Sequence, residues 1–193
     1  MSIKNGSQWG EKLEHIRDDH LVRYRHAATL FSNKKVIDAA CGVGYGSSIL
    51  QHSGCTVDAY DISGEAIAHA RVYFQGAGTV YHHANLYDVV FPKSDVAISF
   101  ETIEHLDHPR GFLIRLRQAV KELIGSVPNE DVNPFNKSGH KWHARHYTPN
   151  EIHTLLVSAG WTVTGMMSQH GKRRKAAEIQ NNTDGMTLVF TAI

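Results

Sequence analysis

The chain of 193 residues contains very little cysteine, and this scarcity limits its class. Two cysteines, Cys41 and Cys55, are too few for a disulfide scaffold, and a chain of this length can bury a sufficient core without one. They fall at opposite ends of two neighbouring expected strands, too far apart for a disulfide bond. We therefore expect two free thiols in a reducing compartment.

The chain also lacks an excess of charge and any long apolar run. Lys and Arg number 20 against 19 Asp and Glu, whereas a protein that binds a polyanion is usually more basic. No apolar stretch approaches the ~20 residues that cross a bilayer, and the N-terminal segment holds no apolar core of signal-peptide length. These absences disfavour nucleic acid as a partner and a membrane span, and they favour a cytoplasmic, soluble protein.

Apolar segments of strand and helix length alternate along most of the chain. After one or two helices over 11–30, we expect strands over 35–39, 55–60, 79–83, 95–100 and 122–127, and helices over 46–53, 64–75 and 109–119. This alternation predicts an α/β fold, doubly wound around a mostly parallel sheet.

Local signals mark where two helices begin and end. Ser63 is placed to cap the helix over 64–75, and Gly76 is placed to end it. Thr148 and Glu151 match a capping box, which predicts a further helix ending near Gly160.

A turn dense in glycine follows the first expected strand. Gly42, Gly44 and Gly46 let the backbone turn sharply and approach a ligand closely, because no Cβ atoms intrude. The pattern departs from the dinucleotide fingerprint, since Ser47 occupies the place of its third glycine. Asp38, four residues before the first glycine, would also stand near the site of a pyrophosphate. A cofactor that carries an ammonium group in place of phosphates fits this acid.

Asp61 ends the second expected strand, where an acid can accept hydrogen bonds from both hydroxyls of a ribose. A ribose and an ammonium without phosphate indicate S-adenosylmethionine. The two motifs resemble those of the class I S-adenosylmethionine-dependent methyltransferases: an acid before Gly-x-Gly-x-Gly, and an acid at the end of strand two. A third segment, Glu-Thr-Ile-Glu-His-Leu over 101–106, is similar to the strand-four segment of the small-molecule branch, the quinone, sugar and natural-product O-methyltransferases.

The resemblance covers about residues 20 to 165 and implies the rest of the architecture. It implies one domain over 1–193, with a Rossmann-like sheet of seven strands, helices on both faces and an antiparallel final strand. The last two strands are expected over 161–167 and 186–192. The parts around the sheet are expected to be an N-terminal helical cap over 1–34, an acceptor-side loop over 128–147, and a mobile basic connection over 168–185.

The resemblance also places the cofactor against the strand ends. The expected contacts are Asp38, Ala40, Gly42, Gly44, Tyr45, Asp61, Ile62, Asn85, Leu86, Phe100, Glu101 and Thr102. Alternatives stay open for several of them. Tyr45 and Ile62 could equally pack in the core, and Asn85 could simply favour a turn. Glu101 or Glu104 could be plain surface charges.

Histidine supplies the candidates for proton transfer. His105, His143 and His146 are the expected catalytic residues, because imidazole can accept the proton of a hydroxyl near neutral pH. A structural or positioning role for His105 stays open, and the loop of the other two could be merely solvated. His140, His143 and His146 recur every three residues, but we expect no metal site, since no nearby cysteine or acid completes a tetrahedral set. The basic run over 172–175 is either a solvated turn or a hold for an anionic group of the acceptor.

The expected function is methyl transfer from S-adenosylmethionine to a small-molecule or glycan acceptor. Abundant histidine around the presumed site favours a hydroxyl over an amine. One alternative is a nucleic-acid methyltransferase, although Ser-Phe-Glu-Thr over 99–102 stands where that class carries Asn/Asp-Pro-Pro-Tyr/Phe. Another is a cofactor-binding regulator, or a cofactor-cleaving enzyme, on the same fold. The family's Pro-Gly-Gly turn before strand five is missing, which leaves the boundaries near residue 120 open, as are the acceptor and the oligomeric state.

Overall fold

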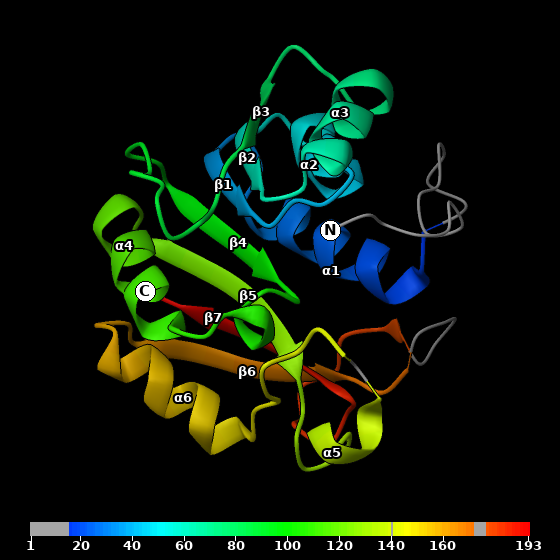
Figure 1. The fold of residues 1–193 in the computed structure, drawn as a ribbon, viewed down its shortest axis with the longest axis vertical. Helices are drawn as coiled ribbons and strands as arrows, with labels where there is room; N and C mark the ends of the chain where they lie inside the picture. The colour runs from blue at the N-terminus through cyan, green and yellow to red at the C-terminus, as the bar shows by residue number, and fades with distance from the viewer. Residues whose placement is uncertain (1–15, 140, 172–176) are drawn as a thin grey trace.

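The computed structural model describes residues 16–139, 141–171 and 177–193. The strands are β1 (Lys35–Ala39), β2 (Thr56–Asp61), β3 (Thr79–His83), β4 (Val96–Phe100), β5 (Glu122–Pro128), β6 (Val163–Gln169) and β7 (Thr187–Ala192). They form a seven-stranded sheet in the order β3-β2-β1-β4-β5-β7-β6 (Figure 1). The first five run parallel, and β7 lies antiparallel between β5 and β6. The expected sheet is confirmed.

Helices pack on both faces of this sheet (Figure 1). The helices are α1 (Asp18–Leu30), α2 (Tyr45–His52), α3 (Gly64–Tyr73), α4 (Pro109–Ala119), α5 (Phe135–Ser138) and α6 (Pro149–Ser158), with a 3-10 turn over Ile103–His105. Side chains of α1, α2 and α3 belong to one apolar cluster, and those of α4 and α6 belong to the other. Two apolar layers therefore enclose the sheet.

The central strand β4 shows how the sequence produces these two layers. All of its residues are buried, as in a parallel strand covered on both faces. Val96, Ile98 and Phe100 belong to the cluster under α1 to α3, whereas Ala97 belongs to the cluster under α4 and α6. Successive side chains of a strand point to opposite faces, so a continuous apolar run supplies both layers.

The predicted helix starts are confirmed. The Ser63 hydroxyl accepts a hydrogen bond from the Ala66 amide at 3.2 Å and so caps α3. The Thr148 hydroxyl accepts from the Glu151 amide, and the Glu151 carboxylate accepts from the Thr148 amide. Both halves of the capping box are therefore present at the start of α6.

The predicted end of α3 at Gly76 is wrong. The helix ends at Tyr73, and Phe74 already leaves the helical conformation while its amide donates to the Ala70 carbonyl. Phe74 is buried in the core, so packing of its ring ends the helix before the glycine is reached.

The connection expected over 168–185 and the loop expected over 128–147 are both more structured than predicted. β6 continues through Ser168 and Gln169, and Ser168 pairs with Gln180 through two backbone hydrogen bonds. The loop begins inside β5 and contains the helix α5. Polar residues form these pieces, and a pattern based on apolar residues therefore misses them. The basic run over 172–175 lies outside the described residues.

Both cysteines are free thiols, as the sequence predicts, and both are buried. Within the described residues, no helix combines the length and the apolar character needed to cross a membrane.

Candidate active site

A cavity of about 510 Å³ opens at the edge of the sheet where the parallel strands end. Its lining includes Gly42 after β1, Glu101 and Glu104 after β4, and the histidines His105 and His143. Open α/β sheets bind ligands at this edge. A larger hollow of about 690 Å³ lies against α6, but its lining contains none of the candidate residues. The cavity at the strand ends is therefore the candidate active site.

The glycine loop between β1 and α2 leaves room for a ligand at one position only among its three glycines. A Cβ atom on Gly44 would lie 2.6 Å from the Ala70 side chain, and one on Gly46 would lie 2.2 Å from the Tyr24 ring. A Cβ atom on Gly42 would have no other atom within 4 Å, and the φ of Gly42, 56°, is in the left-handed region. Gly44 and Gly46 thus serve packing, whereas Gly42 presents bare backbone to the cavity.

Asp61 is held against this loop by hydrogen bonds to both of its carboxylate oxygens. Its Oδ2 accepts from the Gly42 amide at 2.8 Å, and its Oδ1 accepts from the Ser63 amide at 2.8 Å. A carboxylate oxygen can accept more than one hydrogen bond, so each oxygen keeps acceptor capacity for a ligand hydroxyl. The expected pairing of glycine loop and strand-two acid is a direct contact in the structure.

Asp38 lies beneath the loop and is fully buried. Its carboxylate accepts hydrogen bonds from the Tyr24 hydroxyl at 2.9 Å and from the Ser47 hydroxyl at 2.6 Å. Burial raises the pKa of Asp38 to about 6, although both hydrogen bonds act to lower it. The acid therefore ties α1, β1 and α2 together, and its contact with a cofactor ammonium stays a prediction.

The segment after β4 turns sharply into the cavity. Thr102 is buried, and its hydroxyl donates to the carbonyls of Ala39 and Phe100. Glu101 has a φ of 50°, and its Oε1 accepts from the Ser126 hydroxyl at 2.8 Å. Burial acts to raise the pKa of Glu101, but Arg23, His20 and Ser126 outweigh it, so the pKa is lowered. Glu101 therefore stays ionised at the cavity wall.

The residues expected around the methionine and adenine portions of the cofactor lie in different surroundings: one packs against α1, one is exposed and one lies in a turn. The Tyr45 hydroxyl lies 2.9 Å from His20 Nδ1, and its ring meets the Tyr24 ring edge-on, so Tyr45 packs against α1. Ile62 is 68% exposed, which makes the core role considered for it wrong. Asn85 accepts from the Tyr87 amide in a turn.

Ala40 and Leu86 complete the expected cofactor contacts. Ala40 has a φ of 62°, which is uncommon for a residue with a side chain and marks the sharp exit from β1. Leu86 is buried in the layer under α4, and its contact with a cofactor stays a prediction.

Two of the three candidate histidines meet at the cavity. The rings of His105 and His143 are 4.6 Å apart between centroids and nearly perpendicular. His146 is buried and contacts His143 through a hydrogen bond of 2.8 Å between Nε2 of His146 and Nδ1 of His143. His146 does not line the cavity and therefore acts on it only through His143.

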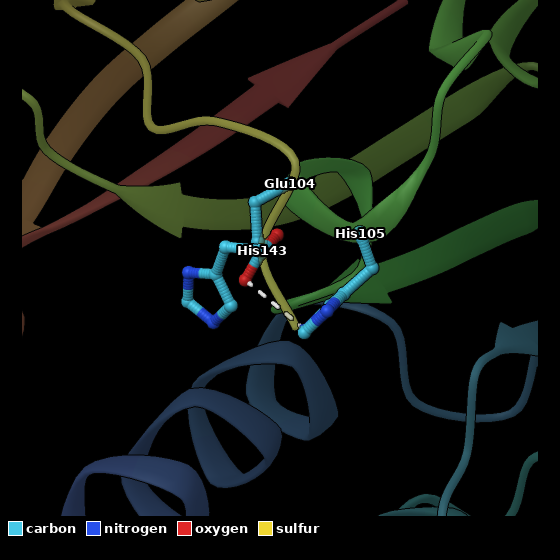
Figure 2. A group of neighbouring side chains, drawn as sticks. All are labelled: Glu104, His105 and His143. Carbon is cyan, nitrogen blue, oxygen red and sulfur yellow. Dashed lines mark ion pairs between the residues drawn. The ribbon is translucent and has the colours of Figure 1, made fainter. Parts of the chain in front are cut away.

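Glu104 is the functional residue that sequence reasoning placed least well. It is fully buried, so the surface role considered for it is wrong. Burial and the nearby Glu101 raise its pKa well above the ordinary range. Figure 2 shows its carboxylate between the rings of His105 and His143, and its Oε1 lies 3.9 Å from His105 Nε2. The expectation that no acid lies near the histidines of the loop is therefore wrong for His143.

Charged residues on α1 form a second feature that the sequence did not reveal. Arg23 is buried, and its Nη1 donates to Gln169 Oε1 at 2.7 Å, across 146 positions of the chain. Asp19, also buried, lies 3.7 Å from the same Arg23 nitrogen. Charges among the apolar residues of a helix normally indicate a solvated face, but here Asp19 lines the cavity beside His20, and the buried Arg23 lies against Asp19.

A family model described as a methyltransferase domain matches residues 13–165. The chain belongs to the methyltransferase domain family. A probable S-adenosylmethionine-dependent methyltransferase of Mycobacterium tuberculosis is 28% identical to it over 169 residues, which cover 80% of this chain and 58% of the relative. The mitochondrial ubiquinone biosynthesis O-methyltransferase of Schizosaccharomyces pombe is 30% identical over 122 residues, covering 58% of this chain and 44% of the relative.

The fold of this methyltransferase-family protein is shared with solved structures. An S-adenosylmethionine-dependent methyltransferase from Mesorhizobium loti superposes with a TM-score of 0.73 at 15% identity, covering 90% of this chain and 99% of that chain. The family resemblance inferred from the glycine loop, Asp61 and the segment after β4 is confirmed. The chain spans 58% of the length of the mycobacterial relative.

Proposed function

We propose that this protein transfers a methyl group from S-adenosylmethionine to a hydroxyl of a small molecule or glycan. The observation that carries the proposal is a single cavity lined both by the glycine loop and by two histidines. One side offers the Gly42 backbone, to which the Asp61 carboxylate is hydrogen-bonded, and the other offers side chains that can accept a proton. A methyl donor and an acceptor need to meet in this way.

The residues at the glycine loop fit such a cofactor. The space above Gly42 is open, and Asp61 is held so that its oxygens can accept from two ribose hydroxyls. Glu101 contributes a negative charge beside the cavity, which suits a cofactor that carries cationic groups. When bound, S-adenosylmethionine supplies an activated methyl group.

The chain would bind the cofactor, orient the acceptor and exclude water from the site. Asp61 holds the ribose, and the buried turn at Thr102 fixes the wall of the cavity opposite Gly42. His105 and His143 lie where an acceptor hydroxyl would approach, and an imidazole there can accept its proton. The hydroxyl acceptor is supported further by the name of the Schizosaccharomyces pombe relative, an O-methyltransferase of ubiquinone biosynthesis.

Calorimetric titration tests the cofactor half of the proposal. S-adenosylmethionine and its demethylated product are titrated into the wild-type protein and into Asp61→Ala. Loss of two hydrogen bonds to a carboxylate, each contributing about 1.5–3 kcal/mol, should weaken binding by about a hundredfold or more. Asp58→Ala is the matched control, because Asp58 lies on the same strand but pairs with His82 outside the cavity.

The outcome of these titrations decides between the alternatives. If a folded protein free of copurified cofactor binds neither ligand, the proposal fails. If both bind, formation of the demethylated product is followed with hydroxylated phenols and sugars, and with amines of the same shape. Product formed only with the hydroxyl compounds supports the proposal, product formed without any acceptor points to cofactor cleavage, and none at all points to a regulator.

A further inference from the structure

Three side chains at the acceptor end of the cavity can direct ligand atoms to one point. Glu104 and His105 follow β4 in the 3-10 turn, and His143 reaches them from the loop before α6 (Figure 2). One ligand atom from each of the three lies within 4.8 Å of the others. Segments 38 residues apart in the chain thus bring two imidazoles and a carboxylate together.

Glu104 is a buried acid whose oxygens are left without a hydrogen-bond donor. The side chain is fully buried, and among the described residues neither Oε1 nor Oε2 has a hydrogen-bond partner. A buried carboxyl group without partners costs free energy, and native structures normally satisfy such groups with protein, water or an ion. A cation between Glu104 and the histidines would satisfy it.

The hydrogen bonds of the histidines determine which ring nitrogens carry protons. His105 Nδ1 lies 2.9 Å from the Trp142 carbonyl oxygen, which can only accept, so the proton of the neutral ring is on Nδ1 and the lone pair is on Nε2. That Nε2 atom is the one nearest Glu104, at 3.9 Å.

The same logic applies along a second chain of contacts. His146 Nδ1 lies 2.6 Å from the Asn133 carbonyl oxygen, so neutral His146 carries its proton there and accepts at Nε2. His143 Nδ1 must then donate to His146 Nε2, and its own lone pair is on Nε2. In Figure 2 this edge of His143 faces Glu104 and His105. A metal-bound histidine typically donates its other nitrogen to a carbonyl or a similar acceptor in this way.

We propose that Glu104, His105 and His143 bind one divalent transition-metal ion, with His146 as a positioning residue for His143. Two imidazole nitrogens and one carboxylate oxygen suit Zn²⁺, Mn²⁺ or Co²⁺, whereas Mg²⁺ and Ca²⁺ prefer oxygen ligands throughout. Three protein ligands leave further coordination positions open toward the cavity, as in catalytic metal sites. This inference rests on the proposed function, because the open positions would hold the acceptor oxygen.

Such an ion would also refine the substrate class. A hydroxyl oxygen bound to a divalent cation loses its proton more readily than a free one. Because the lone pairs of His105 and His143 would bind the ion, that proton would pass to solvent water rather than to either imidazole. Two neighbouring oxygens, as in a catechol or a vicinal diol, could both bind the ion and would fix the orientation of the acceptor. The preferred acceptors are therefore compounds with adjacent hydroxyl groups.

Metal titration in the absence of cofactor and acceptor tests the site directly. The protein is stripped with a chelator and dialysed, and Zn²⁺, Mn²⁺, Co²⁺ and, for comparison, Mg²⁺ are titrated by calorimetry, with Co²⁺ also followed by visible absorption. One ion per chain is expected. Glu104→Gln and His143→Ala should each weaken binding by at least about tenfold. His153→Ala, an exposed histidine of α6, should bind as the wild type does.

Circular dichroism and thermal melting establish that each variant is folded, and if Glu104→Gln is not, His143→Ala alone decides. No binding of any of the three ions by folded wild-type protein would overturn the proposal, as would unchanged binding in the folded variants. Binding of Mg²⁺ in preference to all three would overturn the assignment of the ion class. Cofactor titrations on the metal-free protein keep the two proposals separate, since intact cofactor binding without metal binding refutes the metal site alone.

Discussion

Replacement of Asp38 by asparagine should change how the stability of this protein responds to pH. Asp38 is fully buried under the glycine loop, and burial raises its pKa to about 6 from an ordinary value of 3.8, with a small contribution from Asp61. Hydrogen bonds from Ser47 and Tyr24 act in the opposite direction without cancelling the effect. Protonation of this one acid should therefore be visible in the free energy of unfolding.

The sign follows from which state binds the proton more tightly. Asp38 binds its proton more tightly in the folded protein, because its pKa is higher there than in the unfolded chain. Its contribution to stability is therefore fully present below about pH 3.8 and is lost as the pH rises through about 6. The separation of the two pKa values corresponds to about 3 kcal/mol in total. About 2 kcal/mol of this should be lost between about pH 4.5 and 7.5.

Urea unfolding at several pH values across this range measures the effect. Asparagine cannot ionise, so the free energy of unfolding of Asp38→Asn, relative to wild type, should rise by about 2 kcal/mol from the acidic to the neutral end. Asp131→Asn, an exposed acid in the loop before α5, is the control and should follow the wild type. A difference between Asp38→Asn and wild type that stays constant with pH would refute the reasoning.

Three further substitutions test packing and capping. Gly46→Ala would place a Cβ atom 2.2 Å from the Tyr24 ring, and such overpacking should lower the free energy of unfolding by about 1–3 kcal/mol. In Gly111→Ala, within α4, the added Cβ would lie 3.8 Å from the nearest atom. Urea unfolding should therefore show a free energy of unfolding that is higher by up to about 1 kcal/mol. Equal effects of the two glycine substitutions would contradict the close packing at Gly46. Thr148→Ala removes the side-chain cap of α6 and should cost about 1 kcal/mol, seen as a lower melting temperature. An unchanged melting temperature would mean that the hydrogen bonds with Glu151 contribute nothing.

The parts of the site that could be predicted from the sequence depend on short-range rules. The strand over 35–39 is found with those bounds, because an apolar run followed by a glycine-dense turn specifies a buried strand and its exit. The contact of Gly42 with Asp61 follows from two parallel neighbouring strands that end at the same edge of the sheet. The helix starts at Ser63 and Thr148 were predicted from equally local signals, the capping residues themselves.

The remaining features depend on contacts between distant parts of the chain. The bond between Arg23 and Gln169 joins α1 to the far end of β6, and no local pattern indicates that either polar side chain is buried. Glu104 is similar: its sequence neighbours suggest nothing unusual, yet it is fully buried and lies beside His143, which comes from a distant loop. Burial of a polar group is a tertiary property, so it becomes visible only once the sheet, α1 and the loop are assembled.

The acids at the cavity favour a cofactor without phosphate groups. Glu101 lines its described part with a lowered pKa, so this acid is ionised. The raised pKa of Glu104 favours its uncharged form, and Asp19 is paired with Arg17 and Arg23. An ionised carboxylate at the wall repels a pyrophosphate and attracts a sulfonium or an ammonium. The departure of the glycine loop from the dinucleotide pattern at Ser47 is therefore consistent with the electrostatics of a cavity whose other lining residues come from distant segments of the chain.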